Sequence, residues 1–222
     1  MSVGLLTELQ VRVLRTLTTV TPAWTLTGGA ALAGFYTAHR TTRDLDLFWQ
    51  GLDALGSLPS KVEDTLRAAG FAVDVLQAAP AFHRLRVQQG DEVVVVDLVS
   101  LRRGWIETPA VHTLGDVSLH IDTPHQILVN KLTALLSRAE LRDIEDVRVL
   151  LANGGDLHRA LVDAAQVDGG FSPLTLAWVL ETFPLPLLAT RQGRGSDDIA
   201  SLEAFRRDLI ERVSQAAASD AV

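Results

Sequence analysis

Two aspartates, Asp44 and Asp46, stand two residues apart in an otherwise apolar segment that reads D-L-D-L-F-W-Q. Side chains at positions i and i+2 of a β-strand point to the same face, so both carboxylates would lie on one side of a sheet. Two neighbouring carboxylates can share a divalent metal ion. An ordinary solvent-exposed strand face would show the same spacing, so the pair alone supports both interpretations equally.

A third aspartate, Asp97, interrupts the segment E-V-V-V-V-D-L-V, which has the most strongly buried strand pattern of the chain. A charge at that position is costly unless it is paired or binds a metal. On a strand next to that of Asp44 and Asp46, it would complete a site for one or two Mg²⁺ ions. A hydrogen-bonded aspartate at a strand end is the alternative for Asp97 alone, but the three together favour a metal site.

A glycine pair, Gly28-Gly29, follows the short apolar segment W-T-L-T and precedes an alanine-rich stretch. Backbone N–H groups at the start of a helix can bind phosphate. Glycine pairs mark simple turns more often, and Thr27 would either contact a phosphate or cap the helix. Because the pair lies upstream of the two aspartates, the pattern favours an enzyme that handles a nucleoside triphosphate with Mg²⁺.

Two arginines, Arg40 and Arg43, flank Thr41-Thr42 just before the aspartates. A guanidinium group can bind two phosphate oxygens at once. These arginines are therefore candidate nucleotide ligands, with a simple ion pair to a nearby carboxylate as the alternative.

Lys131 belongs to a second dense block, and it is unusual because only Lys61 and Lys131 are lysines among 20 basic residues. It lies near the apolar side of a predicted helix. Its ammonium group would either extend to water or neutralise charge on a triphosphate. Asp143 and Asp146 fall at the start of the next predicted helix, where the helix dipole favours carboxylates.

Hydrophobic periodicity predicts the elements that must position these residues. Strands and helices alternate up to about residue 122, and beyond it only helices are predicted. The sequence thus predicts an α+β fold, with a sheet domain at 1–122 and a helical domain at 123–222. The predicted strands are 24–27, 44–50, 71–76, 82–88, 92–99 and an edge strand 117–121; the predicted helices are 5–20, 30–38, 61–69, 125–136, 142–151, 157–167, 173–182 and 197–217.

Composition excludes several classes of protein. The chain has 222 residues, a net charge of −7 and no cysteine, which excludes disulfides and thiolate metal sites. The negative charge argues against a general nucleic-acid binder, although arginines such as Arg84 and Arg86 could form a local basic patch. No apolar run is long enough to span a membrane. We therefore expect a cytoplasmic protein that makes no contact with a membrane. Histidine zinc motifs, P-loops and G-x-S-x-G are absent from the sequence.

The motifs L-T-G-G-A-A-L, H-R-T-T-R-D-L-D-L-F and K-L-x-A-L with R-D-I-E-D closely resemble the nucleotidyltransferase AbiEii/AbiGii toxin family. This family belongs to the DNA polymerase β-like nucleotidyltransferases of bacterial toxin–antitoxin and phage-defence systems. The resemblance covers about residues 24–150. It implies a nucleotidyltransferase-like mixed β-sheet core with helices, followed by a helical C-terminal half.

The resemblance also implies roles for individual residues. Gly28 and Gly29 would hold the nucleotide phosphates, while Lys131 would act toward the nucleotide and Asp143 would be needed for activity. Asp44 and Asp46 would bind Mg²⁺, and Asp97 matches the third carboxylate of the superfamily more loosely. Family members often carry serine or threonine after the glycines where this chain has Ala30, which leaves the nucleotide preference open.

The leading hypothesis is a Mg²⁺-dependent nucleotidyltransferase that moves an NMP from an NTP to an acceptor, with tRNA or another RNA among the acceptors. It would be the toxin partner of a cognate antitoxin. A nucleotidyltransferase of the antibiotic-modifying kind is the first alternative, but those enzymes often carry histidine two residues before the first aspartate, where this chain has Thr42. A non-catalytic NTP-binding protein is the second, and the intact set of carboxylates argues against it.

Overall fold

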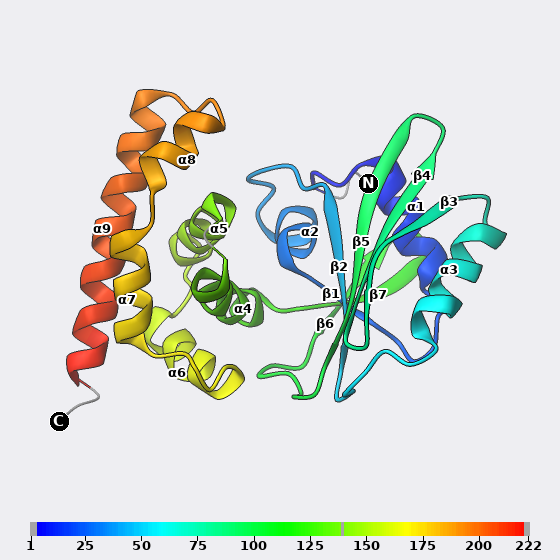
Figure 1. Cartoon of the computed structure of the whole chain (residues 1–222), viewed down its shortest axis with the longest axis horizontal. Coiled ribbons are helices and arrows are strands. Elements are labelled where there is room, and N and C mark those ends of the chain that lie inside the picture. Colours follow the sequence, from blue (N-terminus) through cyan, green and yellow to red (C-terminus); the bar gives the residue numbers. More distant parts are fainter. Residues whose placement is uncertain (1–3, 139, 220–222) are drawn as a thin grey trace. The chain divides into compact units, whose positions relative to one another are not determined.

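The computed structural model describes residues 4–138 and 140–219 (Figure 1). The chain forms two compact units, residues 1–127 and 128–222. The boundary expected from the sequence, between residues 122 and 123, falls between the last strand and the helix that follows it.

The N-terminal unit is built on one mixed sheet, and within the described residues seven strands form it in the order β3-β4-β5-β2-β1-β7-β6. Two pairs, β2–β5 and β1–β7, are parallel, and the other neighbours are antiparallel. The predicted α+β class and mixed sheet are therefore confirmed. The strands are β1 (Thr25–Thr27), β2 (Asp44–Gln50), β3 (Ala72–Ala79), β4 (Phe82–Gln89), β5 (Glu92–Leu101), β6 (Ala110–Leu114) and β7 (Val117–Ile121).

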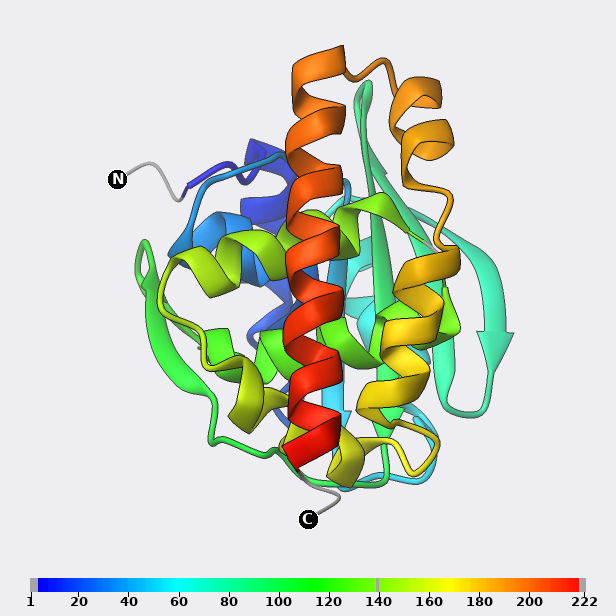
Figure 2. The same ribbon diagram turned by 90° about the vertical axis from the view of Figure 1, so that its left-hand side faces the viewer.

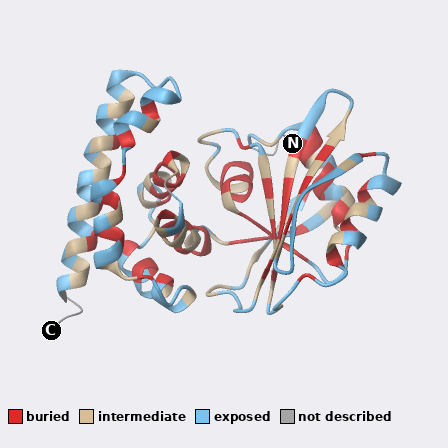
Figure 3. Cartoon of the chain, in the orientation of Figure 1, coloured by how far each residue is buried: buried red, intermediate tan, exposed pale blue. Residues whose placement is uncertain are grey.

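Helices α1 (Glu8–Leu17) and α3 (Leu58–Ala68) lie on one side of this sheet, and the short helix α2 (Gly28–Ala31) lies on the other (Figure 1). Both helices carry buried apolar positions (Figure 3), and α1 contacts β5 while α3 contacts β3. This burial of apolar area is the main force that holds the layers together. The large buried side chains of β2, which are Leu45, Leu47 and Trp49, therefore share one face of the sheet, and polar groups can occupy the opposite face.

The C-terminal unit is helical, as the sequence predicts. The long helix α9 lies beside α7 (Figures 1 and 2). Local signals fix several of the helix starts: the side chains of Asp156 and Ser172 cap α6 and α7, and Pro173 occupies the first turn of α7. The helices are α4 (Pro124–Ser137, which begins in the N-terminal unit), α5 (Leu141–Ala152), α6 (Leu157–Val167), α7 (Pro173–Thr182), α8 (Leu185–Arg191) and α9 (Ser196–Ser219).

Several details differ from the sequence prediction, among them the helix predicted at 5–20, which spans only Glu8–Leu17, and the helix predicted at 61–69, which begins at Leu58. The segment 117–121 is a strand, but it is not at the edge, because the unpredicted strand β6 pairs with its outer side. The unpredicted helix α8 follows Pro184 and carries Pro186 in its first turn, where a missing N–H costs nothing. The helix predicted at 30–38 starts earlier, at Gly28, and its second half, Leu32–Tyr36, is a π-helical turn.

Among the described helices, none is by itself both long and apolar enough to cross a membrane; the bent pair α7–α8 meets those criteria only when its two members are taken together.

Candidate active site

Asp44 and Asp46 lie on the face of β2 opposite the core. Leu45, Leu47 and Trp49 are buried on the inner face, while both aspartates are partly exposed. The strict alternation of the sequence produces this separation because successive strand residues point to opposite faces. The predicted strand Asp44–Gln50 and its two-faced character are confirmed.

Asp97 lies on the neighbouring strand, directly beside Asp46. Strands β2 and β5 run parallel, and their register pairs Asp46 with Asp97. Paired residues of adjacent strands point to the same face of a sheet, so Asp97 shares the face of Asp44 and Asp46. Only 5% of Asp97 is exposed. The predicted adjacency of the third carboxylate is confirmed at the level of strand and register.

Arg84 on β4 binds the Asp97 carboxylate with two hydrogen bonds. Its Nε donates to Oδ1 over 2.7 Å, and its Nη2 donates to Oδ2 over 2.6 Å. These hydrogen bonds raise the pKa of the Arg84 guanidinium against the lowering effect of its burial, and the charges of Asp97, Asp44 and Asp46 raise it further. Arg84 is therefore fully charged within the field of all three carboxylates.

Gly28, the first residue of α2, lies at the site directly after β1, whose last residue Thr27 pairs with Asp46. Gly28 has a φ of +66°, and a β-carbon on it would stand 2.2 Å from Asp46 Oδ2. Glycine is thus required both by the backbone conformation and by the approach of the carboxylate. Thr27 is the N-cap of α2, but its side chain makes no capping hydrogen bond.

The loop before β2 carries the two candidate phosphate-binding arginines. The backbone of Gly29 passes close to Arg40, since a β-carbon on Gly29 would lie 2.7 Å from Arg40 Nη2. Arg43 is exposed. Buried Gln10 on α1 anchors this loop, because its Nε2 donates to the Thr42 carbonyl over 3.0 Å. A helix of the core thereby fixes the chain just ahead of Asp44.

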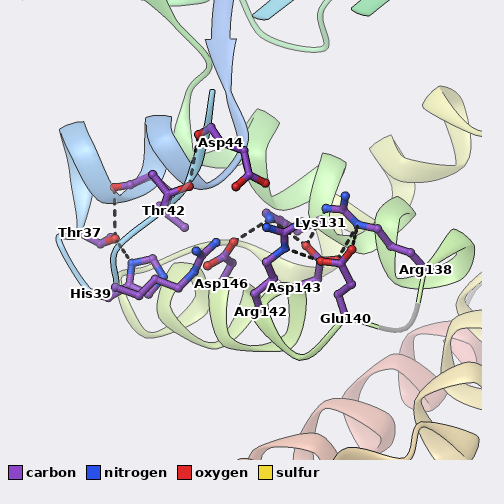
Figure 4. A network of polar contacts seen from close by, with 12 residues as sticks. Thr37, His39, Thr42, Asp44, Lys131, Arg138, Glu140, Arg142, Asp143 and Asp146 are labelled. Carbon is purple, nitrogen blue, oxygen red and sulfur yellow. Dashed lines mark hydrogen bonds and ion pairs between the residues drawn. The ribbon is translucent and has the colours of Figure 1, made fainter. Parts of the chain in front are cut away.

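The second predicted group lies in the C-terminal unit (Figure 4). The Lys131 ammonium contacts Asp143 at 2.8 Å and Asp146 at 2.7 Å. Arg138 also binds Asp143, through Nε at 2.9 Å and Nη2 at 3.1 Å. Burial acts to lower the pKa of Arg138, while Asp143 and Glu140 together raise it. Two cations therefore share one fully buried carboxylate.

The environment of Lys131 excludes one of the two sequence interpretations. Only 5% of Lys131 is exposed, so its ammonium group does not extend to water. Asp143 does lie in the first turn of α5, as the helix-start interpretation requires, but its oxygens bind side chains. A contact between Lys131 and a nucleotide stays a prediction.

The structure brings Asp44, Asp46, Asp97 and Gly28 together in the N-terminal unit, and it joins Lys131 to Asp143 in the C-terminal unit. Within residues 4–138 and 140–219, no three His, Cys, Asp or Glu side chains are arranged to hold a metal ion. The roles assigned to the aspartates as metal ligands therefore stay predictions.

Sequence reasoning missed the roles of Arg84 and Gln10. The sequence offers Arg84 and Arg86 as a local basic patch, yet each of these arginines pairs with a carboxylate of its own, Asp97 and Asp74 respectively. The sequence feature that predicts the pairing of Arg84 with Asp97 is the hairpin turn at Gly90-Asp91. In an antiparallel hairpin, each step away from the turn pairs the next residue of one strand with the preceding residue of the other. The pair Gln89–Glu92 at this turn therefore implies the pair Arg84–Asp97 five steps further on.

Three solved structures share this fold. A candidate nucleotidyltransferase from H. pylori is 18% identical, with a TM-score of 0.53 and coverage of 95% of this chain and 98% of that chain. JHP933 from Helicobacter pylori is 18% identical, with a TM-score of 0.52 and coverage of 96% and 97%. An antigenic nucleotidyltransferase-like protein from Paracoccidioides brasiliensis is 16% identical, with a TM-score of 0.51 and coverage of 86% and 88%. At these identities the likeness establishes the fold.

The family comparison goes further. No curated protein matches the chain. The model of the family described as nucleotidyl transferase AbiEii toxin, type IV TA system, matches residues 12–220. This range includes both the aspartate face of the sheet and the Lys131–Asp143 pair. The chain therefore belongs to the AbiEii family of nucleotidyl transferase toxins, and it is a nucleotidyltransferase.

Proposed function

We propose that this protein is a Mg²⁺-dependent nucleotidyltransferase that moves an NMP from an NTP to an RNA acceptor, with tRNA as the first acceptor to test. An acceptor hydroxyl would give up its proton to a carboxylate of the site or to water while its oxygen bonds to the α-phosphorus of the NTP. The bond from this phosphorus to the oxygen that bridges to the β-phosphorus would break, and pyrophosphate would leave. The activity would be that of a toxin held in check by a cognate antitoxin. We place it in the cytoplasm, where NTPs and tRNA occur together.

The observation that carries this proposal is the position of Asp46. It shares a face with Asp44 on its own strand, pairs with Asp97 on β5, and lies against Gly28, the first residue of α2. Carboxylates beside a glycine-started helix combine the two features that nucleotidyl transfer needs, which are metal ligands and a cradle for phosphate.

The residues fit a divalent cation at Asp44 and Asp46. Both side chains are partly exposed on one strand face, and carboxylate oxygens are ligands that Mg²⁺ prefers. A bound Mg²⁺ would supply positive charge to the phosphoryl oxygens. The close approach of Gly28 to Asp46 would bring the phosphates of the nucleotide within reach of the same carboxylate.

Gly28 and Gly29 would hold the phosphates through their backbone N–H groups at the start of α2. Arg40 lies beside Gly29, so its guanidinium group would contact the same phosphates, and exposed Arg43 would join it from the end of the loop. The hydrogen bond from Gln10 to the loop would keep both arginines near the aspartates.

Lys131 and Asp143 would act as a unit. An ammonium group has three N–H donors, and two of them are directed at Asp143 and Asp146. The proposed contact with the triphosphate would use the third donor or require the exchange of one carboxylate. Asp143 would then hold Lys131 in position, which gives a physical reason for its requirement in catalysis.

The test is transfer of label from each α-labelled NTP to total RNA in the presence of Mg²⁺. Wild type should label RNA, and Asp46→Asn should reduce labelling at least about 100-fold. Even the loss of a residue that only hydrogen-bonds to a metal ligand typically lowers metal affinity or activity about 10- to 100-fold. Asp74→Asn is the matched control, because Asp74 is an exposed carboxylate on β3 that pairs with Arg86. Equal labelling by wild type and Asp46→Asn would contradict the proposal.

The acceptor and the biological role need separate measurements. Aminoglycosides and lincosamides, offered beside RNA, would distinguish an antibiotic-modifying enzyme from an RNA-modifying one. Expression of wild type should arrest bacterial growth, whereas Asp46→Asn at equal protein level should not. Growth arrest by both wild type and Asp46→Asn would show that toxicity does not depend on nucleotidyl transfer.

A further inference from the structure

Four residues form one continuous row across four strands of the sheet. Thr27 on β1 pairs with Asp46 on β2, Asp46 pairs with Asp97 on β5, and Asp97 pairs with Arg84 on β4. All four side chains therefore point to the same face. Arg84 is the cationic end of a row whose middle is the candidate metal site.

Arg84 is held firmly at this end. Both oxygens of Asp97 accept hydrogen bonds from it, and its guanidinium carbon lies 5.4 Å from the centroid of the Phe82 ring. A planar guanidinium group is well suited to bind a carboxylate on one side and to contact an aromatic ring on another. Asp97 and Phe82 together therefore fix the position of the Arg84 guanidinium group.

This pairing changes what Asp97 can do. Arg84 occupies one lone-pair position on each oxygen of Asp97 and holds its guanidinium charge against the carboxylate. A divalent cation on the same carboxylate would stand beside this positive charge, and the repulsion between the two opposes its binding. Asp97 is 5% exposed, while the Arg84 side chain is 41% exposed. Release of Arg84 without a replacement would leave a buried charge unpaired, which is costly.

We propose that the Arg84 guanidinium group takes the place at Asp97 where a second divalent cation would otherwise bind, so that this site holds one metal ion, on Asp44 and Asp46. The inference rests on the proposed function and specifies its metal count. Arg84 provides a positive charge beside Asp97 and in the field of Asp46, and three of its five N–H donors remain beyond the two used by Asp97. Those donors suit phosphate oxygens of the NTP.

The test is the number of Mn²⁺ ions bound by the full-length, nucleotide-free protein, measured from the loss of the free-ion EPR signal. Mn²⁺ is a suitable probe because carboxylate sites accept Mg²⁺ and Mn²⁺ alike. Wild type should bind one Mn²⁺ per chain, and Arg84→Ala should bind two. Adding Asp97→Asn to Arg84→Ala should return the number to one.

Two further variants keep the result interpretable. Arg86→Ala is the matched control, since Arg86 lies on the same face of β4 but pairs with Asp74, and it should bind one Mn²⁺. Arg84→Gln keeps a hydrogen-bond donor near Asp97 without the charge, so it serves if Arg84→Ala does not fold. It too should gain a second Mn²⁺, and its melting temperature should rise more with Mn²⁺ than that of wild type.

The possible outcomes distinguish a failure of this inference from a failure of the proposed function. Two Mn²⁺ ions on wild type, or one on both wild type and the Arg84 variants, would overturn the inference and leave the proposed nucleotidyl transfer intact. A second Mn²⁺ in Arg86→Ala would also overturn it, because the effect would then be one of general charge. No Mn²⁺ on any variant would overturn the metal assignment of the proposed function as well.

Discussion

Gly28 and Asp46 are so close that a β-carbon on Gly28 would stand 2.2 Å from the Asp46 carboxylate oxygen. No real β-carbon approaches an oxygen this closely, so any side chain at position 28 must displace the carboxylate or the start of α2. The proposed phosphate-binding glycine and the proposed metal ligand are therefore coupled through one contact.

Gly28→Ala should destabilise the protein and abolish NTP binding. A left-handed backbone costs an L-residue about 1–2 kcal/mol, and the collision with Asp46 adds to this. Gly90→Ala is the matched control, because Gly90 also has a positive φ, of 61°, but nothing lies within 4 Å of its added β-carbon. Urea denaturation and a nucleotide-binding titration measure the two effects. Equal losses of stability in both variants would show that the contact with Asp46 has no energetic weight.

Lys131→Met should lower the free energy of unfolding by about 3–5 kcal/mol, because it leaves Asp143 and Asp146 buried with less positive charge. The control is Lys61→Met at the only other lysine of the chain, which is exposed and should change stability by less than about 0.5 kcal/mol. Urea denaturation followed by circular dichroism measures both. Similar stabilities would mean that the Lys131 pairs contribute little to folding, and any loss of transfer activity would then report on catalysis.

Gln10→Ala should loosen the loop ahead of Asp44. Gln10 is buried and donates to the Thr42 carbonyl, so its removal leaves that acceptor unpaired at a cost of about 1–3 kcal/mol. Hydrogen exchange should become faster in the loop at 39–43 and stay unchanged in α6. Gln10→Glu keeps the acceptor that binds the Thr7 N–H but removes the donor. It should reproduce the faster exchange of the loop; protection equal to wild type would assign the anchoring to other contacts.

Tyr36 should titrate at unusually high pH. Burial raises the pKa of its hydroxyl group, and the negative charge of Asp122 raises it further, from 10.0 to about 12. The folded state then holds this proton more tightly than the unfolded state, so its contribution to stability is complete below pH 10 and is lost as pH rises toward 12.

The tyrosinate absorbance reports on this group alone, since the chain contains one tyrosine. The native protein should show its midpoint about two pH units above that of the urea-unfolded protein. Tyr36→Phe should show no such signal, and its stability should lose the part of the pH dependence that falls between pH 10 and 12. A shared midpoint in the native and unfolded states would contradict the structural assignment.

Local patterns predicted most of the elements because their signals lie within the elements themselves. The alternation from Asp44 to Gln50 gave the bounds of β2 and the face of each side chain, and the helix predicted at 173–182 coincides with α7. The short strand β6 and the proline-containing helix α8 escaped prediction. In both, few residues carry the pattern, and the surrounding packing decides the conformation.

Within the candidate site, the sequence by itself determined which chemical groups are present, the common face of Asp44 and Asp46, and, through the two-residue turn at Gly90-Asp91, the partner of Arg84. Only the tertiary structure decided that Asp46 stands beside Asp97, because β2 and β5 are distant in the chain and run parallel. No turn fixes such a register. The register of β2 and β5 is set by the side chains of both strands that must be buried against α1 and α3. This requirement acts only once the sheet and the helices pack together.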